Sequence, residues 1–303
     1  EEESSVFNGI FFVDRNLKSI GSLRALIKSL NPDAIHIHST FAGIICRLLP
    51  FIPREKVIYT PHGYAFLRDE HSLLLRSFYL IEKLLSKRCA VIAGCGVDER
   101  NMAISFIGEE NTVELVNVCD ILPEVKIVRS KVALPTIGMI GRISNQKGFE
   151  FFLNTSKAFE GRAHFKWIGG GDLKRETLLR EAGIEVTGWM DRARVISHLK
   201  GLDLYFHTAA WEGFPISLLE ASRLNKPILL RAIPPFLAES LPTVINVQEA
   251  IAQIHSWLSN TKDTIERFSN TSHEINHYHS PERLRHSLNS LYSRFDTRAK
   301  VKR

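Results

Sequence analysis

The chain has 303 residues, of which 44% are apolar and 24% are charged, and this composition excludes an intrinsically disordered protein. Its net charge of +6 fits an anionic ligand, an anionic membrane surface or nucleic acid without choosing among them. No apolar run in the sequence reaches the ~18 residues that a membrane-spanning helix needs. At roughly 100–200 residues per domain, the length predicts two domains.

In the first half, short apolar runs rich in β-branched residues alternate with segments of helical period. The predicted strands are Val6–Val13, Ala34–His38, Val57–Thr60, Ala90–Ala93 and Val113–Val118. The predicted helices are Ser22–Leu30, Ala42–Leu49, Leu73–Ser86 and Glu99–Phe106. The four cysteines form no C-x-x-C pair, so we expect reduced thiols, as in a cytosolic protein.

The second half repeats the same rhythm after a predicted junction near Arg129–Pro135. Its predicted strands are Thr136–Gly141, His164–Ile168, Glu185–Thr187, Leu204–His207 and Pro227–Leu230. Its predicted helices are Gly148–Phe159, Leu173–Ala182, Arg192–Leu199, Pro215–Arg223, Gln248–Leu258, Asp263–Phe268 and Pro281–Tyr292. Strands that alternate with helices of this length predict βαβ units, and therefore an α/β fold with parallel sheets.

The segment from Trp211 to Glu220 carries the strongest chemical signal. A predicted strand leads into a glycine turn, and Pro215 stands where a helix would begin. The free N–H groups at such a helix start attract a phosphate or a polar sugar. Glu212 and Glu220 are on the order of 12 Å apart along the chain at helical rise, too far for a hydrolase carboxylate pair. Two solvated glutamates on an amphipathic helix remain the alternative.

A second cluster of chemically suggestive residues lies at the end of the strand Thr136–Gly141. There Arg142 is delivered to the carboxyl edge of the sheet, and Lys147 opens the next helix. A guanidinium and an ammonium at that edge can hold a diphosphate without a metal ion. The sequence contains no Asp-x-Asp motif, which agrees with a metal-free site. The alternative is a strand–loop–helix with two surface cations.

Together with Gly169-Gly170-Gly171, these segments resemble the donor-binding domain of retaining family-four glycosyltransferases of the GT-B fold. That fold has two Rossmann-like domains with parallel sheets that face a cleft. The resemblance runs from about Thr136 to Pro235 and includes the family's E-x7-E pattern. The resemblance implies that Arg142 and Lys147 bind the diphosphate, with Gly141 beside them. Glu212, Gly213 and Phe214 would contact the transferred sugar, and Glu220 would hold the ribose. Trp189 and Met190 would lie beside the base.

The first half is similar to the same family. Tyr59-Thr60-Pro61-His62-Gly63 looks like the strand end whose histidine faces the donor sugar, so the resemblance gives His62 a catalytic role. A loop histidine satisfied by the backbone is the alternative. His36 and His38 share one strand face, but two ligands without a third are weak grounds for a metal site.

The sequence also departs from the family. Asn225 replaces the glycine that ends the E-x7-E helix, which a left-handed asparagine cap tolerates. Pro234-Pro235 replaces a common Gly-Gly pair, and Asn117-Val118-Cys119-Asp120 replaces Asn-Gly-x-Asp. The family's opening strand and glycine-rich loop have no counterpart. Because the chain starts at Glu1, we expect that it begins partway into the first domain.

We therefore predict an N-terminal acceptor-side domain over 1–131, a donor-binding domain over 132–280, and a returning helix with a basic tail over 281–303. The predicted activity is transfer of a sugar, with retention, from a UDP- or GDP-sugar to a saccharide or lipid-linked acceptor, in cell-surface polysaccharide synthesis. No cofactor or metal is expected. The alternatives are a non-catalytic nucleotide-sugar-binding scaffold, a sugar-nucleotide epimerase of the same fold and, less favoured, a dinucleotide oxidoreductase.

The expected partners are the nucleotide sugar and the acceptor, and nucleic acid is not expected. The basic tail predicts weak, salt-sensitive contact with an anionic membrane surface, through Arg294, Arg298, Lys300, Lys302 and Arg303 against Asp296. The apolar helix Leu73–Leu85, with Lys83, Lys87 and Arg88, is a second candidate for that contact, but we favour a helix buried in its domain. The predicted location is cytoplasmic, with peripheral contact at the inner face of the cell membrane.

Overall fold

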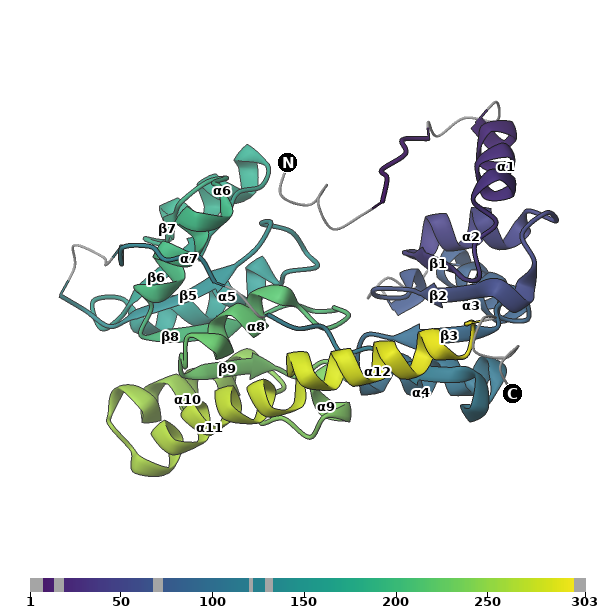
Figure 1. The fold of residues 1–303 in the computed structure, drawn as a ribbon. Helices are drawn as coiled ribbons and strands as arrows, with labels where there is room; N and C mark the ends of the chain where they lie inside the picture. Colours follow the sequence, from purple (N-terminus) through teal and green to yellow (C-terminus); the bar gives the residue numbers. More distant parts are fainter. Residues whose placement is uncertain (1–7, 14–18, 68–72, 120–121, 129–132, 297–303) are drawn as a thin grey trace.

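The computed structural model describes residues 8–13, 19–67, 73–119, 122–128 and 133–296. Within these ranges the strands form two separate parallel sheets, one from each half of the chain (Figure 1). The first has the order β1-β2-β3-β4 and the second the order β10-β9-β8-β5-β6-β7. Helices flank both sheets (Figure 1), so the α/β fold with parallel sheets is confirmed.

The first sheet contains β1 (Ile35–His38), β2 (Val57–Thr60), β3 (Val91–Gly94) and β4 (Thr112–Glu114). Its helices are α1 (Ser19–Leu30), α2 (Thr40–Leu48), α3 (Leu73–Ser86) and α4 (Val97–Ile107), with short 3-10 turns η2 (Arg54–Lys56), η3 (Ala65–Leu67) and η4 (Glu109–Asn111). Strands β2 and β3 are buried along their whole length, as expected for central strands covered on both faces.

The predicted strand Val6–Val13 is wrong over its described part. Residues 8–13 form no strand, and residues 6–7 lie outside the described ranges. Phe12 is 96% exposed, and Ile10, Phe11 and Val13 are also exposed. An apolar run forms a stable strand only when another strand pairs with it, and its own sequence does not report whether such a partner lies nearby.

The second sheet contains β5 (Thr136–Ile140), β6 (His164–Ile168), β7 (Glu185–Val186), β8 (Leu204–His207), β9 (Ile228–Arg231) and β10 (Thr243–Val244). Its helices are α5 (Phe149–Ser156), α6 (Leu173–Glu181), α7 (Arg192–Lys200), α8 (Ile216–Arg223), α9 (Pro234–Ala238), α10 (Val247–Leu258) and α11 (Lys262–Tyr278), with the turn η5 (Lys157–Phe159). Strand β10 and helix α9 were not predicted, and α11 continues well beyond its predicted end at Phe268.

Helix α12 (Pro281–Ser293) leaves the second half and runs along the first (Figure 1). Leu291 on this helix is fully buried in a cluster with Ile58 and Val91 of the first sheet. At its start, the Arg283 guanidinium donates to Glu114 over 3.1 Å. The last helix therefore ties the two halves together.

A buried ion pair joins the two helices α2 and α3. Arg47 donates to Glu82 over 2.7 Å, and the two side chains are 0% and 1% exposed. Tyr59 donates to the other Glu82 oxygen over 2.9 Å, and the Arg47 guanidinium lies 3.9 Å above the Tyr59 ring. The carboxylate is thus fully compensated, which a buried charge requires.

We expect Glu82→Ala to lower the free energy of unfolding by about 3–5 kcal/mol, because it leaves the Arg47 charge buried without a partner. Urea denaturation measures this change. Glu109→Ala is the matched control, since it removes the exposed Arg100–Glu109 pair and should cost about 1 kcal/mol or less. Equal losses for the two variants would contradict the burial argument.

Candidate active site

Two cavities meet between the halves of the molecule. The first, of about 260 Å³, is lined mainly by the first half, and the second, of about 440 Å³, mainly by the second half. His62, Glu212 and Gly213 line both cavities. The predicted catalytic residues of opposite halves are therefore neighbours at one junction.

The loop after β8 presents Glu212 to this junction. Phe214 anchors the loop, since it is 4% exposed and packs against Phe236. Pro215 then caps α8, as the sequence predicted for a helix start. The Nζ of Lys147 donates to the Glu212 carboxylate.

Two glycines bring Lys147 to that carboxylate. A Cβ on Gly141 (φ +147°) would lie 3.0 Å from Lys147 Cε, so the lysine stem runs over the bare glycine backbone. A Cβ on Gly148 (φ +67°) would lie only 1.9 Å from the Thr208 carbonyl oxygen. Only glycine permits both the left-handed conformation and this close approach. The loop after β5 thereby packs against the end of β8.

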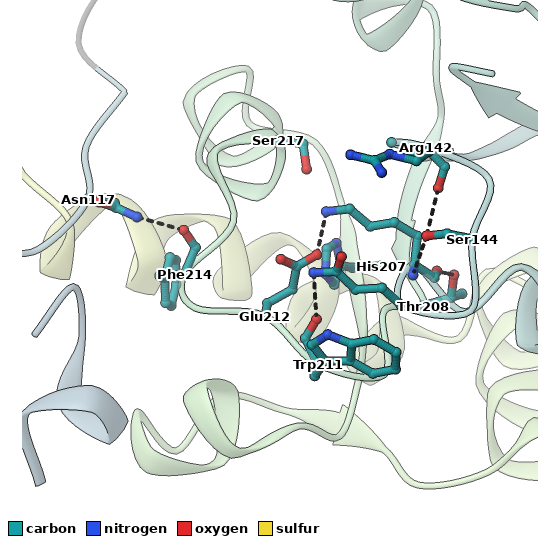
Figure 2. Close-up of polar contacts among 12 residues, drawn as sticks. Asn117, Arg142, Ser144, His207, Thr208, Trp211, Glu212, Phe214 and Ser217 are labelled. Atoms are coloured by element: carbon teal, nitrogen blue, oxygen red, sulfur yellow. Dashed lines mark hydrogen bonds and ion pairs between the residues drawn. The ribbon is translucent and has the colours of Figure 1, made fainter. Parts of the chain in front are cut away.

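Arg142 is exposed, and in the part of the chain that the structure describes its guanidinium makes no hydrogen bond or ion pair. Figure 2 shows its side chain pointing toward Ser217, which lies near the start of α8 and lines the second cavity. Sequence reasoning missed Ser217, although its place just after Pro215 at a helix start was an available signal.

The predicted ribose and base contacts lie outside the lining of both cavities. Glu220 is nearly buried and accepts from Arg192 Nε over 3.1 Å. Burial raises the pKa of Glu220, and Arg192 opposes that shift. Trp189 is 68% exposed beside Gly170, whereas Met190 is partly buried against the core.

His62 sits in a strained turn and contacts two side chains. The sequence raised one of them, His38, only as a weak metal-ligand candidate, and it did not select the other, Cys95. The φ of His62 is +53°, which is uncommon for a residue other than glycine. His62 Nε2 lies 2.8 Å from His38 Nδ1, and His62 Nδ1 lies 3.1 Å from Cys95 Sγ. These contacts on both ring nitrogens fix the orientation of the imidazole.

The Glu99 carboxylate stabilises the same turn through backbone hydrogen bonds. It is 2% exposed and accepts backbone N–H bonds from Gly63 and, over 2.9 Å, from Cys95. A Cβ on Gly213 would lie 3.2 Å from Glu99 Oε1, so the carboxylate also touches the loop of the other half. Burial raises the pKa of Glu99, and the two N–H bonds oppose that shift.

Three histidines share the edge of the first sheet. His36 and His38 stack with ring centroids 4.2 Å apart, and His38 stacks on His62 at 5.1 Å. Burial is the largest cause that lowers the pKa of each ring. For His36, burial together with the neighbouring His38 and His62 lowers the pKa to about 4. Among the described residues, no group of three or more potential ligands is arranged to hold a metal ion.

Where the chain passes from one half to the other, both crossings contact Phe214 in the loop after β8. Asn117 Nδ2 donates to the Phe214 carbonyl over 2.8 Å. His279, at the second crossing, stacks on the Phe214 ring with centroids 3.7 Å apart. Its Nδ1 lies 2.9 Å from the Asn117 carbonyl oxygen, and Nε2 contacts the buried Glu239.

Two curated relatives are similar to this chain. An uncharacterized 41.2 kDa protein in the cps region of Klebsiella pneumoniae is 28% identical over 258 residues, which cover 77% of this chain and 69% of the relative. The UDP-Gal:alpha-D-GlcNAc-diphosphoundecaprenol alpha-1,3-galactosyltransferase of Escherichia coli is 26% identical over 252 residues, which cover 72% of this chain and 62% of that protein.

Solved structures match the arrangement of both halves. HepE of Anabaena in complex with UDP superposes with a TM-score of 0.70 at 14% identity, over 91% of this chain and 82% of that one. Sucrose-phosphate synthase of Thermosynechococcus elongatus gives a TM-score of 0.72 at 13% identity, over 93% and 80%. At this identity the likeness concerns the fold, and it is the GT-B fold.

Models of two glycosyltransferase families match separate parts of the sequence. The model "Glycosyltransferase Family 4" matches residues 4–116, and "Glycosyl transferases group 1" matches residues 134–259. The two matches coincide with the first and the second sheet. The chain belongs to the family-four glycosyltransferases of the GT-B fold.

Proposed function

We propose that this glycosyltransferase moves a sugar from a UDP- or GDP-sugar, with retention and without a metal ion, to a hydroxyl of a saccharide or lipid-linked acceptor. The observation that carries the proposal is the junction of the two cavities at His62, Glu212 and Gly213. A donor in the second cavity and an acceptor in the first would meet there. The carboxylate and the imidazole then contact the transferred sugar from opposite sides.

The second cavity suits a nucleoside diphosphate. Lys147 and the start of α8 line it, and the exposed Arg142 points toward Ser217, another lining residue (Figure 2). When the bond to the anomeric carbon breaks, negative charge gathers on the diphosphate. Two cations and the N–H groups of a helix start stabilise that charge. Trp189 and Glu220 belong to the proposal as base and ribose contacts.

The Lys147–Glu212 pair has a consequence for the donor-free protein. The ammonium that would bind the diphosphate already neutralises the carboxylate that would bind the sugar. Donor binding would exchange this ion pair for two contacts with the ligand. Neither charge is left without a partner in either state, as a partly buried site requires.

The first cavity is the proposed acceptor site. Ser39, Phe41 and Tyr64 line it, so it offers both hydroxyl and aromatic contacts. The name of the Escherichia coli relative, with a diphosphoundecaprenol-linked acceptor, supports a lipid-linked acceptor here. The Klebsiella pneumoniae relative in a cps region supports a role in cell-surface polysaccharide synthesis. We place the protein in the cytoplasm, at the inner face of the membrane.

Arg142→Ala should weaken nucleotide binding by about 1.5–3 kcal/mol, the scale of a hydrogen bond to a charged group. The measurement is calorimetric titration of UDP and of GDP in EDTA. Arg162→Ala is the control, because Arg162 is an exposed arginine before β6, away from the carboxyl ends of the strands. Complete loss of wild-type binding in EDTA would refute the metal-free site.

Glu212→Gln and His62→Ala should each reduce turnover at least about tenfold while nucleotide affinity stays within a factor of about two, because both residues are assigned to the sugar. Glu220→Gln should instead weaken nucleotide binding first. The assay follows nucleotide release from UDP- and GDP-sugars by the full chain that the gene encodes, with and without acceptor lipid. Nucleotide binding without any turnover would favour the scaffold alternative.

Turnover should fall on the acid side only below pH 6.5. Burial and the neighbouring His38 lower the pKa of His62, so its ring stays neutral until the pH drops through the lowered value. An NMR titration of the ring protons should therefore give midpoints below 6.5 for His62 and near 4 for His36. A His62 midpoint above 6.5 would contradict the neutral ring.

A further inference from the structure

Cys95 and Glu99 form a buried cluster beneath the imidazole of His62. Cys95 follows β3, and Glu99 lies in the first turn of α4, three residues after the helix cap. A Cβ on Gly94 would lie 2.5 Å from the Arg100 backbone nitrogen, so the glycine lets the helix begin close to the strand end. A glutamate at this place in a first turn folds back to the N–H groups that precede the helix. Both residues are therefore buried, at 1% and 2% exposure.

The proton of the Cys95 thiol is directed to Glu99. Burial raises the pKa of this thiol, and the Glu99 charge and its hydrogen bond with the thiol raise it further, so the sulfur keeps its proton near neutral pH. The Glu99 carboxylate accepts backbone N–H bonds on both of its oxygens, from Gly63 and from Cys95. These donors favour the ionised carboxylate, and an ionised acceptor forms the stronger hydrogen bond. The single thiol proton therefore points to Glu99.

The direction of the thiol proton sets the tautomer of His62. Cys95 Sγ lies 3.1 Å from His62 Nδ1 and has no second proton to give, so Nδ1 is the N–H donor in that contact. Burial and the neighbouring His38 lower the pKa of His62, which keeps its ring neutral. A neutral imidazole carries one N–H, so Nε2 keeps its lone pair. His38 Nδ1, 2.8 Å from that nitrogen, is then the donor of the second contact.

The nitrogen that keeps its lone pair is the one available to a ligand. Nδ1 faces the buried Cys95, whereas the His62 ring is exposed and lines both cavities. We propose that Cys95 and Glu99 are positioning residues that hold His62 as its Nδ1–H tautomer, so that Nε2 accepts a hydrogen bond from a hydroxyl of the transferred sugar. That hydroxyl replaces the His38 N–H. The sugar rests on the proposed function, but the tautomer is measured without ligand or turnover.

The test is an NMR measurement of the histidine ring nitrogens in the nitrogen-labelled full chain at neutral pH, where His62→Ala identifies the His62 signals. The wild type should carry the His62 proton on Nδ1 and none on Nε2. In Cys95→Ala a methyl group faces Nδ1, and an N–H there would lose its acceptor. The ring should then shift to the Nε2–H tautomer and donate to His38. A wild-type His62 with its proton on Nε2 would overturn the inference.

Cys95→Ser separates the hydrogen bonds of the thiol from its packing. A serine hydroxyl also donates to Glu99 and accepts from His62, so this variant should keep the Nδ1–H tautomer and keep kcat within about threefold. Cys95→Ala should lower kcat at least about fivefold, the effect of one hydrogen bond, and leave nucleotide affinity unchanged. Equal losses of kcat in the serine and alanine variants would show that only the size of the sulfur matters, and would overturn the positioning role.

Two further variants complete the test. Glu99→Gln removes the charge that attracts the thiol proton, so it should populate the Nε2–H tautomer as Cys95→Ala does. Circular dichroism checks its folding, and the two Cys95 variants carry the test if it does not fold. Cys46→Ala is the matched control, because this partly buried thiol lies on α2, outside the lining of both cavities. It should leave the His62 tautomer and kcat unchanged, and a tautomer shift in this variant would contradict the assignment to Cys95.

Turnover separates this inference from the proposed function. A chain that shows the Nδ1–H tautomer and its shift in Cys95→Ala, but turns over no nucleotide sugar, would sustain the positioning of His62 and reject the transferase proposal. Undiminished turnover by a Cys95→Ala variant with a shifted tautomer would do the opposite, because the transferase would then work without a lone pair on Nε2.

Discussion

The Lys147–Glu212 ion pair is the interaction around which the site is organised. It joins the loop after β5 to the loop after β8, and the bare backbone of Gly141 and Gly148 makes the approach possible. Without the pair, two opposite charges would stand partly buried at the mouth of a cavity. In the function that we propose, its position sets where the diphosphate and the sugar lie, and His62 of the first half completes the site.

How much the sequence could predict depends on the range of the interactions involved. Strand–helix alternation predicted both sheets. The left-handed Asn225 after α8 was anticipated because it replaces the family's helix-ending glycine and asparagine tolerates that conformation. Cys95 and Glu99 were missed as partners of the His62 turn, because they lie more than thirty positions away and contact it only in the fold. For the same reason, the apolar sequence of the run ending at Val13 could not show that its described part, residues 8–13, pairs with no strand.

Burial of charge follows a consistent pattern across the molecule. Arg47 with Glu82 fastens two helices far from the chemistry, whereas Glu99 holds a backbone turn through N–H groups. In both cases every carboxylate oxygen has a donor, which is the condition under which a buried carboxylate is tolerated. The same chemistry thus builds the scaffold and orients the turn that carries His62.

The contacts of both crossings with Phe214 couple the loop after β8 to the hinge between the two halves. Asn117 and His279 are bonded to each other, and each also contacts the residue two positions after Glu212. A hinge motion between the halves would strain these contacts, so the conformation of the loop after β8 is coupled to the angle between the domains. Opening and loop displacement are then a single event, and a ligand that steadies the loop also resists opening.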